Sequence, residues 1–97
     1  MSIYIVLGNF TDQGIRNVKE TTKRAEALRA TATKLGITVK ETYWTLGRYD
    51  VVTIIDAPND ASVTALGLSL GALGNVRTET LRAFQADEMG QIVSRVV

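Results

Sequence analysis

Hydrophobic and polar positions along this chain recur with regular periods, and these periods divide it into strands and helices. The segment 3–10 is rich in β-branched and aromatic residues, which predicts a strand, and the same composition predicts strands over 37–45, 49–56 and 75–84. Between the first two strands, apolar residues at helical spacing predict an amphipathic helix over 12–35. Its expected buried stripe consists of Ile15, Val18, Thr22, Ala25, Leu28, Ala32 and Leu35.

A second helix is predicted over 60–74, with Asp60 as its N-cap. Gly67 and Gly71 each cost about 1 kcal/mol relative to alanine in a helix, so their spacing indicates close packing against a neighbour. Dimerisation in a membrane is disfavoured because the segment is short and carries polar residues. The tail, 87–97, is predicted to form a short amphipathic helix capped by Asp87.

The resulting order is βαββαβ with a tail helix, which is the ferredoxin-like α+β arrangement in a single domain over 1–97. A four-stranded antiparallel sheet is expected, with the first and third strands in its centre and both helices on one face. The two central strands nevertheless carry apolar residues on both of their sides. The first has Ile3, Ile5 and Leu7 opposite Tyr4, Val6 and Phe10, and the third has Val51 and Ile55 opposite Val52 and Ile54. Because an open sheet should have one solvated face, a second copy is expected to cover the helix-free face.

The stretch WTLGRYDVV, residues 44–52, joins the second and third strands. A two-residue loop of Gly47 and Arg48 would form a type II′ turn, although a longer loop stays possible. The two-residue loop pairs Trp44 with Val51 and Thr42 with Thr53, and it pairs Thr45 with Asp50. Trp44 and Tyr49 would then share one face, with Asp50 on the other.

Two separated segments, LGRYDVVTIIDAP (46–58) and LGNVRTETLRAF (73–84), together with NFTDQGI (9–15), resemble the GYD family of small bacterial proteins. The family takes its name from a glycine, tyrosine and aspartate motif, here Gly47, Tyr49 and Asp50. The resemblance covers nearly the whole chain and implies the dimeric α/β barrel superfamily. It implies no settled activity, because that superfamily includes cofactor-free monooxygenases, lactone isomerases, haem enzymes and ligand-sensing domains.

Composition narrows the possible chemistry. The chain has no cysteine and no histidine, so metal or haem sites built on those side chains are excluded, and we expect no cofactor. Eleven lysines and arginines against ten acidic residues leave a net charge of +1, which does not indicate a nucleic-acid partner. No apolar run approaches membrane length and the start lacks a basic leader, so a cytoplasmic protein without membrane contact is expected.

Candidate functional residues come from the polar and aromatic positions of the strands. A pocket between the sheets of a dimer could hold a small apolar ligand, with these candidates: Asn9, Thr42, Trp44, Tyr49, Thr53, Thr78, Thr80 and Phe84. The same residues could instead simply fill the barrel. Asp50, Arg77 and Glu79 could form a charged cluster at the sheet end or at an oligomer interface, and such clusters are more often structural than catalytic.

Two functional hypotheses follow from this pattern. The first is a homo-oligomeric small-molecule-binding protein, which could also be a cofactor-free oxygenase or isomerase. The second is a structural or protein-interaction module whose sheet edges or tail build a larger assembly. Whether the chain is an enzyme is left open, because without histidine any acid or base work would fall to a carboxylate or a tyrosine.

Overall fold

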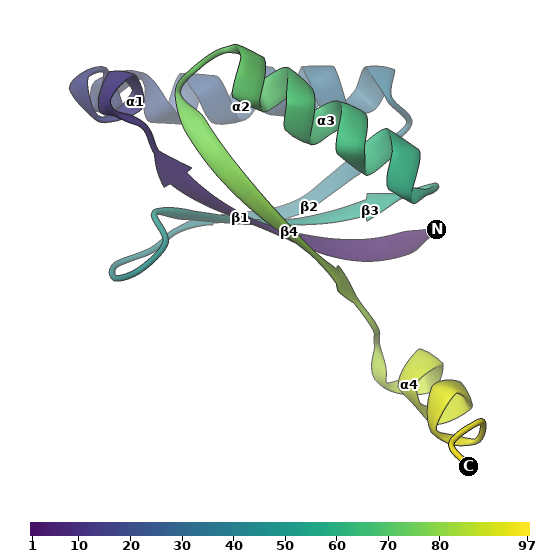
Figure 1. Cartoon of the computed structure of the whole chain (residues 1–97). Helices are drawn as coiled ribbons and strands as arrows, with labels where there is room; N and C mark the ends of the chain where they lie inside the picture. Colours follow the sequence, from purple (N-terminus) through teal and green to yellow (C-terminus); the bar gives the residue numbers. More distant parts are fainter.

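The four strands form one antiparallel sheet in the order β2-β3-β1-β4, as the computed structural model of residues 1–97 shows (Figure 1). The strands are β1 Ser2–Phe10, β2 Thr38–Trp44, β3 Val51–Ala57 and β4 Val76–Ala83. The helices are α1 Asp12–Arg16, the 3-10 helix η1 Val18–Glu20, α2 Thr21–Lys34, α3 Asp60–Ala72 and α4 Ala86–Val93. The first and third strands are central, so the predicted ferredoxin-like topology is confirmed.

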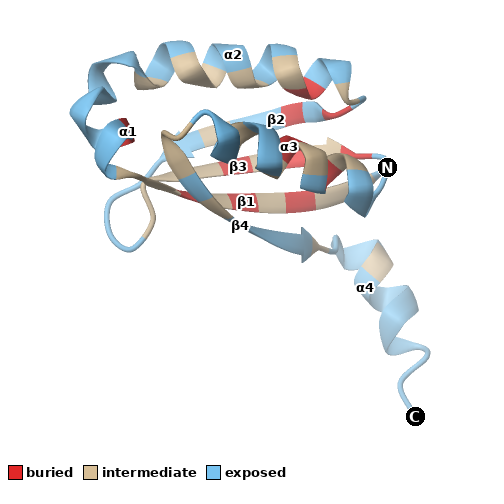
Figure 2. Cartoon of the chain, turned by 45° about the horizontal axis from the view of Figure 1, so that its top comes forward, coloured by how far each residue is buried: buried red, intermediate tan, exposed pale blue.

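Helices α2 and α3 lie side by side on one face of the sheet, and α4 projects away from the body at the end of β4 (Figure 1). The buried residues gather between these two helices and the strands, whereas α4 is almost entirely exposed (Figure 2). The opposite sheet face has no cover within the chain. We call it the open sheet face, and its apolar residues are Ile3, Ile5, Leu7, Tyr43, Val52, Ile54 and Leu81. The prediction that both faces of the central strands are apolar is therefore confirmed.

The single helix predicted over 12–35 is interrupted, and that prediction is wrong in its first third. The Thr11 side chain caps α1 by accepting from the Gly14 amide at 3.1 Å, but Asn17 (φ −107°, ψ 29°) leaves the helical region and ends it. A 3-10 turn follows before α2 begins at Thr21. Ile15 therefore turns away from the core and is 53% exposed.

Two predicted helix caps also differ from the structure. Asn59, not Asp60, caps α3 and accepts from the Ser62 amide at 2.9 Å. The fourth helix begins one residue before Asp87, and the N-cap position falls on Gln85. In both cases the chain enters its helix slightly earlier than the polar pattern suggested, because several neighbouring polar residues were suitable caps.

The predicted pairing of the β2–β3 hairpin is confirmed, with Trp44 opposite Val51 and Thr42 opposite Thr53. The Thr45 amide also donates to the Asp50 carbonyl at 2.9 Å. The strand ladder ends at Trp44, however, so the connection is longer than a two-residue turn, and Gly47 lies in it at φ 117°. A register shift between Val39 and Glu41 marks a β-bulge earlier in β2. This bulge lets Val39 and Thr42 point to the same, helix-covered face despite their odd spacing.

Glycine has different roles in α1 and α3. A Cβ on Gly14 would lie 2.0 Å from the carbonyl oxygen of Asn75, so α1 packs directly against the backbone before β4. A Cβ on Gly71 would meet nothing within 4 Å, and one on Gly67 would make an ordinary contact with Thr78 at 3.8 Å. The expectation that the two glycines of α3 serve close packing is therefore wrong.

This contrast is directly testable. Gly14→Ala is expected to lower the free energy of unfolding by about 2 kcal/mol, because the added methyl group clashes with backbone that cannot move away. Gly71→Ala is expected to raise it by about 1 kcal/mol, because alanine is the better helix former and the space is free. Urea unfolding followed by circular dichroism measures both. Equal effects of the two substitutions would contradict the packing described for α1.

Candidate functional site

A cavity of about 300 Å³ lies between the helices and the sheet. The packed core fills only one half of this layer, where the second half of α2 and the first half of α3 meet the strands through Ala32, Val63 and Leu66. The cavity occupies the other half, next to the beginning of α2 and the end of α3. Its apolar walls include Val6, Phe10, Ala25, Leu28, Val51, Leu70, Leu73 and Val76.

Small side chains explain why this half of the layer is hollow. Successive helix-facing positions of β1 carry Tyr4 and Val6, both buried in the core, and then Gly8, which has no side chain to offer. From above, α2 contributes Ala25 and Ala27 to the cavity wall. The backbone spacing is set by the larger residues of the core, so the small residues leave a space that neither layer can close.

The polar groups of the cavity are mainly hydroxyls. Thr42, Thr53 and Thr78 come from three different strands, and all three line the cavity. Thr53 is only 4% exposed, and it lines the cavity. A hydroxyl among apolar walls is a candidate anchor for a polar group of a molecule inside the cavity.

The structure divides the predicted ligand-binding residues into three groups. Trp44, Thr53 and Thr78 line the cavity together with Thr42, as does Phe10, which the sequence analysis did not single out as a site residue. Thr80 instead lines a separate and more open hollow beside α3. The remaining candidates, Asn9, Tyr49 and Phe84, do not contribute to the cavity wall. The cavity also lies under the helices, on the face opposite to the one expected to meet a second sheet.

The prediction that Trp44 and Tyr49 share a face is wrong. The Trp44 indole Nε1 donates to Thr21 Oγ1 in α2 at 3.0 Å, so this ring lies on the helix side. The Tyr49 hydroxyl donates to Glu79 Oε2 at 3.2 Å, and Glu79 alternates with the helix-facing Thr78 and points to the open sheet face. Strict alternation ends with the ladder at Trp44, so it does not carry through the loop to Tyr49.

Asp50 ties the loop back to the sheet. Its carboxylate accepts from the Phe10 amide at 2.9 Å, and its own amide donates to the Gly8 carbonyl at 2.9 Å. These bonds hold the end of β1 against the hairpin. No ion pair joins Asp50, Arg77 and Glu79 within the chain, whose two ion pairs are Lys23–Glu20 and Arg82–Glu88. Of the glycine, tyrosine and aspartate motif, the tyrosine and the aspartate thus make contacts that position the loop.

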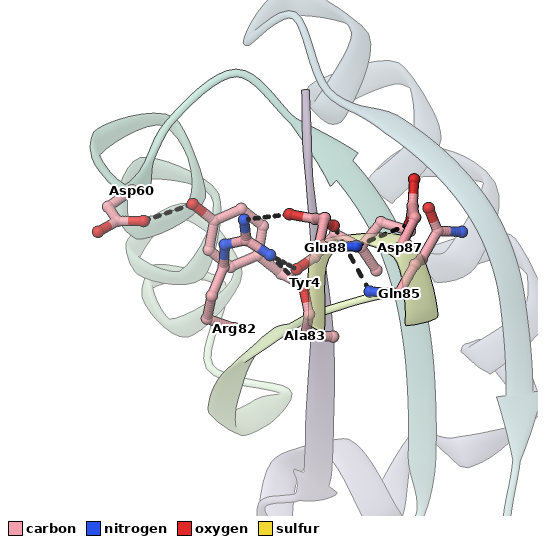
Figure 3. Close-up of polar contacts among 8 residues, drawn as sticks. Tyr4, Asp60, Arg82, Ala83, Gln85, Asp87 and Glu88 are labelled. Carbon is pink, nitrogen blue, oxygen red and sulfur yellow. Dashed lines mark hydrogen bonds and ion pairs between the residues drawn. The ribbon is translucent and has the colours of Figure 1, made fainter. Parts of the chain in front are cut away.

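A polar cluster that the sequence analysis did not identify surrounds Tyr4 (Figure 3). The Tyr4 hydroxyl donates to the Asp60 carboxylate at the start of α3. On the other side, the Arg82 guanidinium lies 5.6 Å from the Tyr4 ring and 4.5 Å from the Phe84 ring, and it pairs with Glu88 at 3.2 Å. The cluster therefore connects α3, β1, β4 and the beginning of α4.

The hydrogen bond to Asp60, burial and the Asp60 negative charge together raise the pKa of Tyr4 above its usual 10.0, against a smaller opposing effect of Arg82. A raised folded-state pKa means that this group stabilises the fold below pH 10 and that the contribution is lost as pH rises through the folded-state value. Tyr4, Asp60 and Arg82 all line the more open hollow, so these polar groups are already engaged in contacts within the chain.

An alkaline titration tests this placement. The absorbance of the tyrosinate band is expected to include a late transition above pH 10, which belongs to Tyr4. Asp60→Ala removes both the hydrogen bond and the charge, so it is expected to lower the pKa of that tyrosine towards 10. Tyr4→Phe identifies the late transition by abolishing it. A late transition that persists in Asp60→Ala would contradict the assignment.

The structure contains neither a cluster of metal ligands nor a helix that could span a membrane. No three histidine, cysteine, aspartate or glutamate side chains come close enough together to hold a metal ion. None of the helices combines the length and the apolar character that crossing a membrane requires.

The strand order, the antiparallel register and the two helices on one face define a ferredoxin-like α+β protein with a cavity between its layers. The family model described as GYD domain matches residues 4–93, and the chain belongs to this family. The resemblance inferred from the sequence segments is thereby confirmed.

This chain is similar to proteins from Thermus thermophilus. A curated protein of that species, the glutamine synthetase and cystathionine beta-lyase binding protein, is 30% identical over 90 residues, which cover 92% of this chain and 95% of that protein. The crystal structure of TTHA0845 from the same species superimposes with a TM-score of 0.57 at 27% identity and covers 89% of this chain and 96% of that one. In both comparisons the similarity extends over nearly the full length of each chain.

Proposed function

We propose that this protein is a homo-oligomeric small-molecule-binding protein, in which chains join through their open sheet faces and each chain holds a ligand in its own helix-side cavity. The observation that carries the proposal is the cavity itself, with its apolar walls and the threonine hydroxyls, Thr53 among them, that line it. The proposed binding site is therefore the cavity between the helices and the sheet of one chain, and not the pocket between two sheets that the sequence analysis expected.

The size of the cavity is suitable for a small organic molecule. Its volume of about 300 Å³ is at the lower end of the range of known ligand pockets, about 300–1,000 Å³. An apolar cavity of ~150 Å³ engineered into another protein is enough to hold benzene. A two-ring aromatic molecule or an aliphatic chain of similar size would therefore suit this space.

The residues of the cavity favour binding over catalysis. Its lining contains no aspartate, glutamate, lysine or tyrosine, so no usual general acid or base faces a bound molecule. The polar groups that remain are hydroxyls, the Trp44 indole, the Asn75 amide and the guanidinium of Arg24. A cofactor-free oxygenase or isomerase of the superfamily's kind would need chemistry supplied by the ligand itself, and for this reason binding is the primary proposal.

The open sheet face supports self-association. A single chain buries only 12 of its 97 residues, while this face keeps Tyr43 and Leu81 about half exposed in the company of five further apolar residues. Large contiguous apolar patches on soluble proteins usually mark interfaces. A second copy presents the same surface, so a two-fold arrangement would cover both faces at once.

A charge in the middle of the open sheet face is expected to abolish self-association. The native chain is expected to be a dimer or a higher even oligomer at micromolar concentration. Ile5→Lys is expected to yield monomers, because Ile5 lies between Ile54 and Leu81 and the lysine would be buried without a partner. Leu68→Lys, at an exposed position on α3, serves as the control and should leave the mass unchanged. Multi-angle light scattering gives the mass, and a monomeric native protein would refute the proposed assembly.

Filling the cavity is expected to weaken ligand binding without harming the fold. Ala25→Leu places three more carbon atoms in the space, so it should weaken binding of 2-naphthalenemethanol at least fivefold and leave the free energy of unfolding unchanged or raised by about 1 kcal/mol. Ala30→Leu, on the exposed side of the same helix, is the matched control. Isothermal titration calorimetry measures the affinity, and equal affinity in both variants would place the ligand outside this cavity.

A protein-interaction module is the second candidate, and one observation favours it. The exposed helix α4 carries Met89, Ile92 and Val93, which contact no other element of the fold closely enough to be buried. An amphipathic helix with a bare apolar side is a common recognition element. The relative named as a binding protein for glutamine synthetase and cystathionine beta-lyase is consistent with such a role here.

If α4 assists assembly, a chain ending at Ala86 is expected to sediment as a smaller species than the full chain. Ile92→Asp should have the same effect through a single side chain, whereas Gln91→Asp adds the same charge to the same exposed helix and should not. Sedimentation velocity measures all three. Unchanged assembly of the shortened chain would remove α4 from the interface and leave a hetero-partner as its only role.

A further inference from the structure

We infer that the ligand of the helix-side cavity is an organic anion, with an apolar body among the cavity walls and a carboxylate group at the end formed by Thr21, Arg24 and Asn75. The inference rests on the proposed small-molecule-binding function and adds the chemical class of the ligand. We call these three residues the donor end of the cavity, and all three line it.

Arg24 is the only charged residue in the cavity wall. Its guanidinium donates to the carbonyl oxygens of Asn17 at 3.0 Å and Gly14 at 3.2 Å, and it lies 5.8 Å from the centre of the Phe10 ring. These contacts fix the group in one position. No carboxylate of the chain pairs with it, because the two ion pairs of the protein involve other residues. A half-buried arginine thus remains without a counter-charge at the edge of an apolar space.

Arg24 also keeps donors for a ligand. A guanidinium has five N–H groups in a planar fork, and the two carbonyls use one from each terminal nitrogen. Three N–H groups are left. The planar, delocalised cation suits a carboxylate better than a neutral acceptor, because charge-assisted hydrogen bonds are roughly twice as strong as neutral ones.

The neighbouring polar groups are donors as well. The Asn75 carbonyl oxygen Oδ1 already accepts from Gln13 Nε2 at 2.9 Å, which leaves the Asn75 amide N–H groups without a partner. Thr21 Oγ1 accepts from the Trp44 indole at 3.0 Å, so its own hydroxyl proton is available. Asn75 and Arg24 are also neighbours, since the backbone of Gly14 contacts both of them. The donor end therefore offers hydrogen-bond donors from three residues and no negative charge.

The rest of the cavity determines the body of the ligand. Away from the donor end the walls are mainly apolar, and the polar groups there are hydroxyls, which belong to Thr31, Thr42, Thr53, Ser69 and Thr78. Such walls favour an aromatic or aliphatic group, and a hydroxyl or keto substituent on it could pair with Thr53. A small aromatic or medium-length aliphatic carboxylic acid combines these features, whereas sugars, nucleotides and cations do not.

Two probes of the same shape test this inference on the full chain. Isothermal titration calorimetry compares 2-naphthoate with the neutral 2-naphthalenemethanol at low and at moderate ionic strength. The carboxylate is expected to bind at least tenfold more tightly, and the advantage should shrink as salt is added. Arg24→Met keeps the length of the side chain and removes the charge, so it should make the two affinities nearly equal. Lys23→Met removes a neighbouring exposed charge and should preserve the tenfold preference.

The outcomes separate the two levels of the proposal. Equal binding of both probes to the native protein would overturn the anion inference and leave the cavity as a ligand site. Binding of neither probe would overturn the inference together with the proposed function. If Arg24→Met still prefers 2-naphthoate, another group of the protein binds the carboxylate, and the anion inference is refuted. Should Arg24→Met fail to fold, Arg24→Lys retains the charge without the two-carbonyl fork, and it is expected to keep a reduced preference for 2-naphthoate.

Discussion

A four-stranded sheet with two packed helices can cover only one of its faces, and this constraint governs the rest of the molecule. The central strands of this chain are apolar on both sides. Helices α2 and α3 bury the apolar residues on one face of the sheet and leave the open sheet face uncovered. The single chain therefore leaves an apolar surface exposed. The proposed self-association would cover this surface, so it rests on the geometry of the layers rather than on any special motif.

The covered face is itself divided in two. At one end, buried residues such as Ile37 and Val63 pack into the core, and their size sets the distance between helices and sheet. At the other end, Gly8 and Ala25 are too small to fill that distance, and a cavity results. The same division decides where the charged group lies, because Arg24 lines the cavity at the hollow end. One layer thus supplies both the stability and the proposed binding site.

Much of the architecture could be predicted because it depends on local patterns. Alternation and turn residues identified each strand, and the two-residue alternative for the loop at Gly47 and Arg48 predicted the pairing of Trp44 with Val51 that the structure shows. Other features depend on contacts between distant segments. The break at Asn17 serves to pack Gly14 against Asn75, and the bond between Tyr4 and Asp60 spans 56 positions. No periodicity within a short window contains that information.

For the candidate site, the sequence by itself determined the types of residue and the absence of histidine and cysteine, and with them the family and the strand order. Only the tertiary structure decided that Trp44 and Tyr49 point to opposite faces, and that the hydroxyl of Thr53 opens under the helices. The physical reason is that side chains alternate between the two faces of a sheet along a regular strand. The sequence therefore predicts the face of each residue within the ladder, but not beyond its end or past a bulge. A cavity, moreover, is set by what distant neighbours fail to fill, which is a property of packing and not of any one segment.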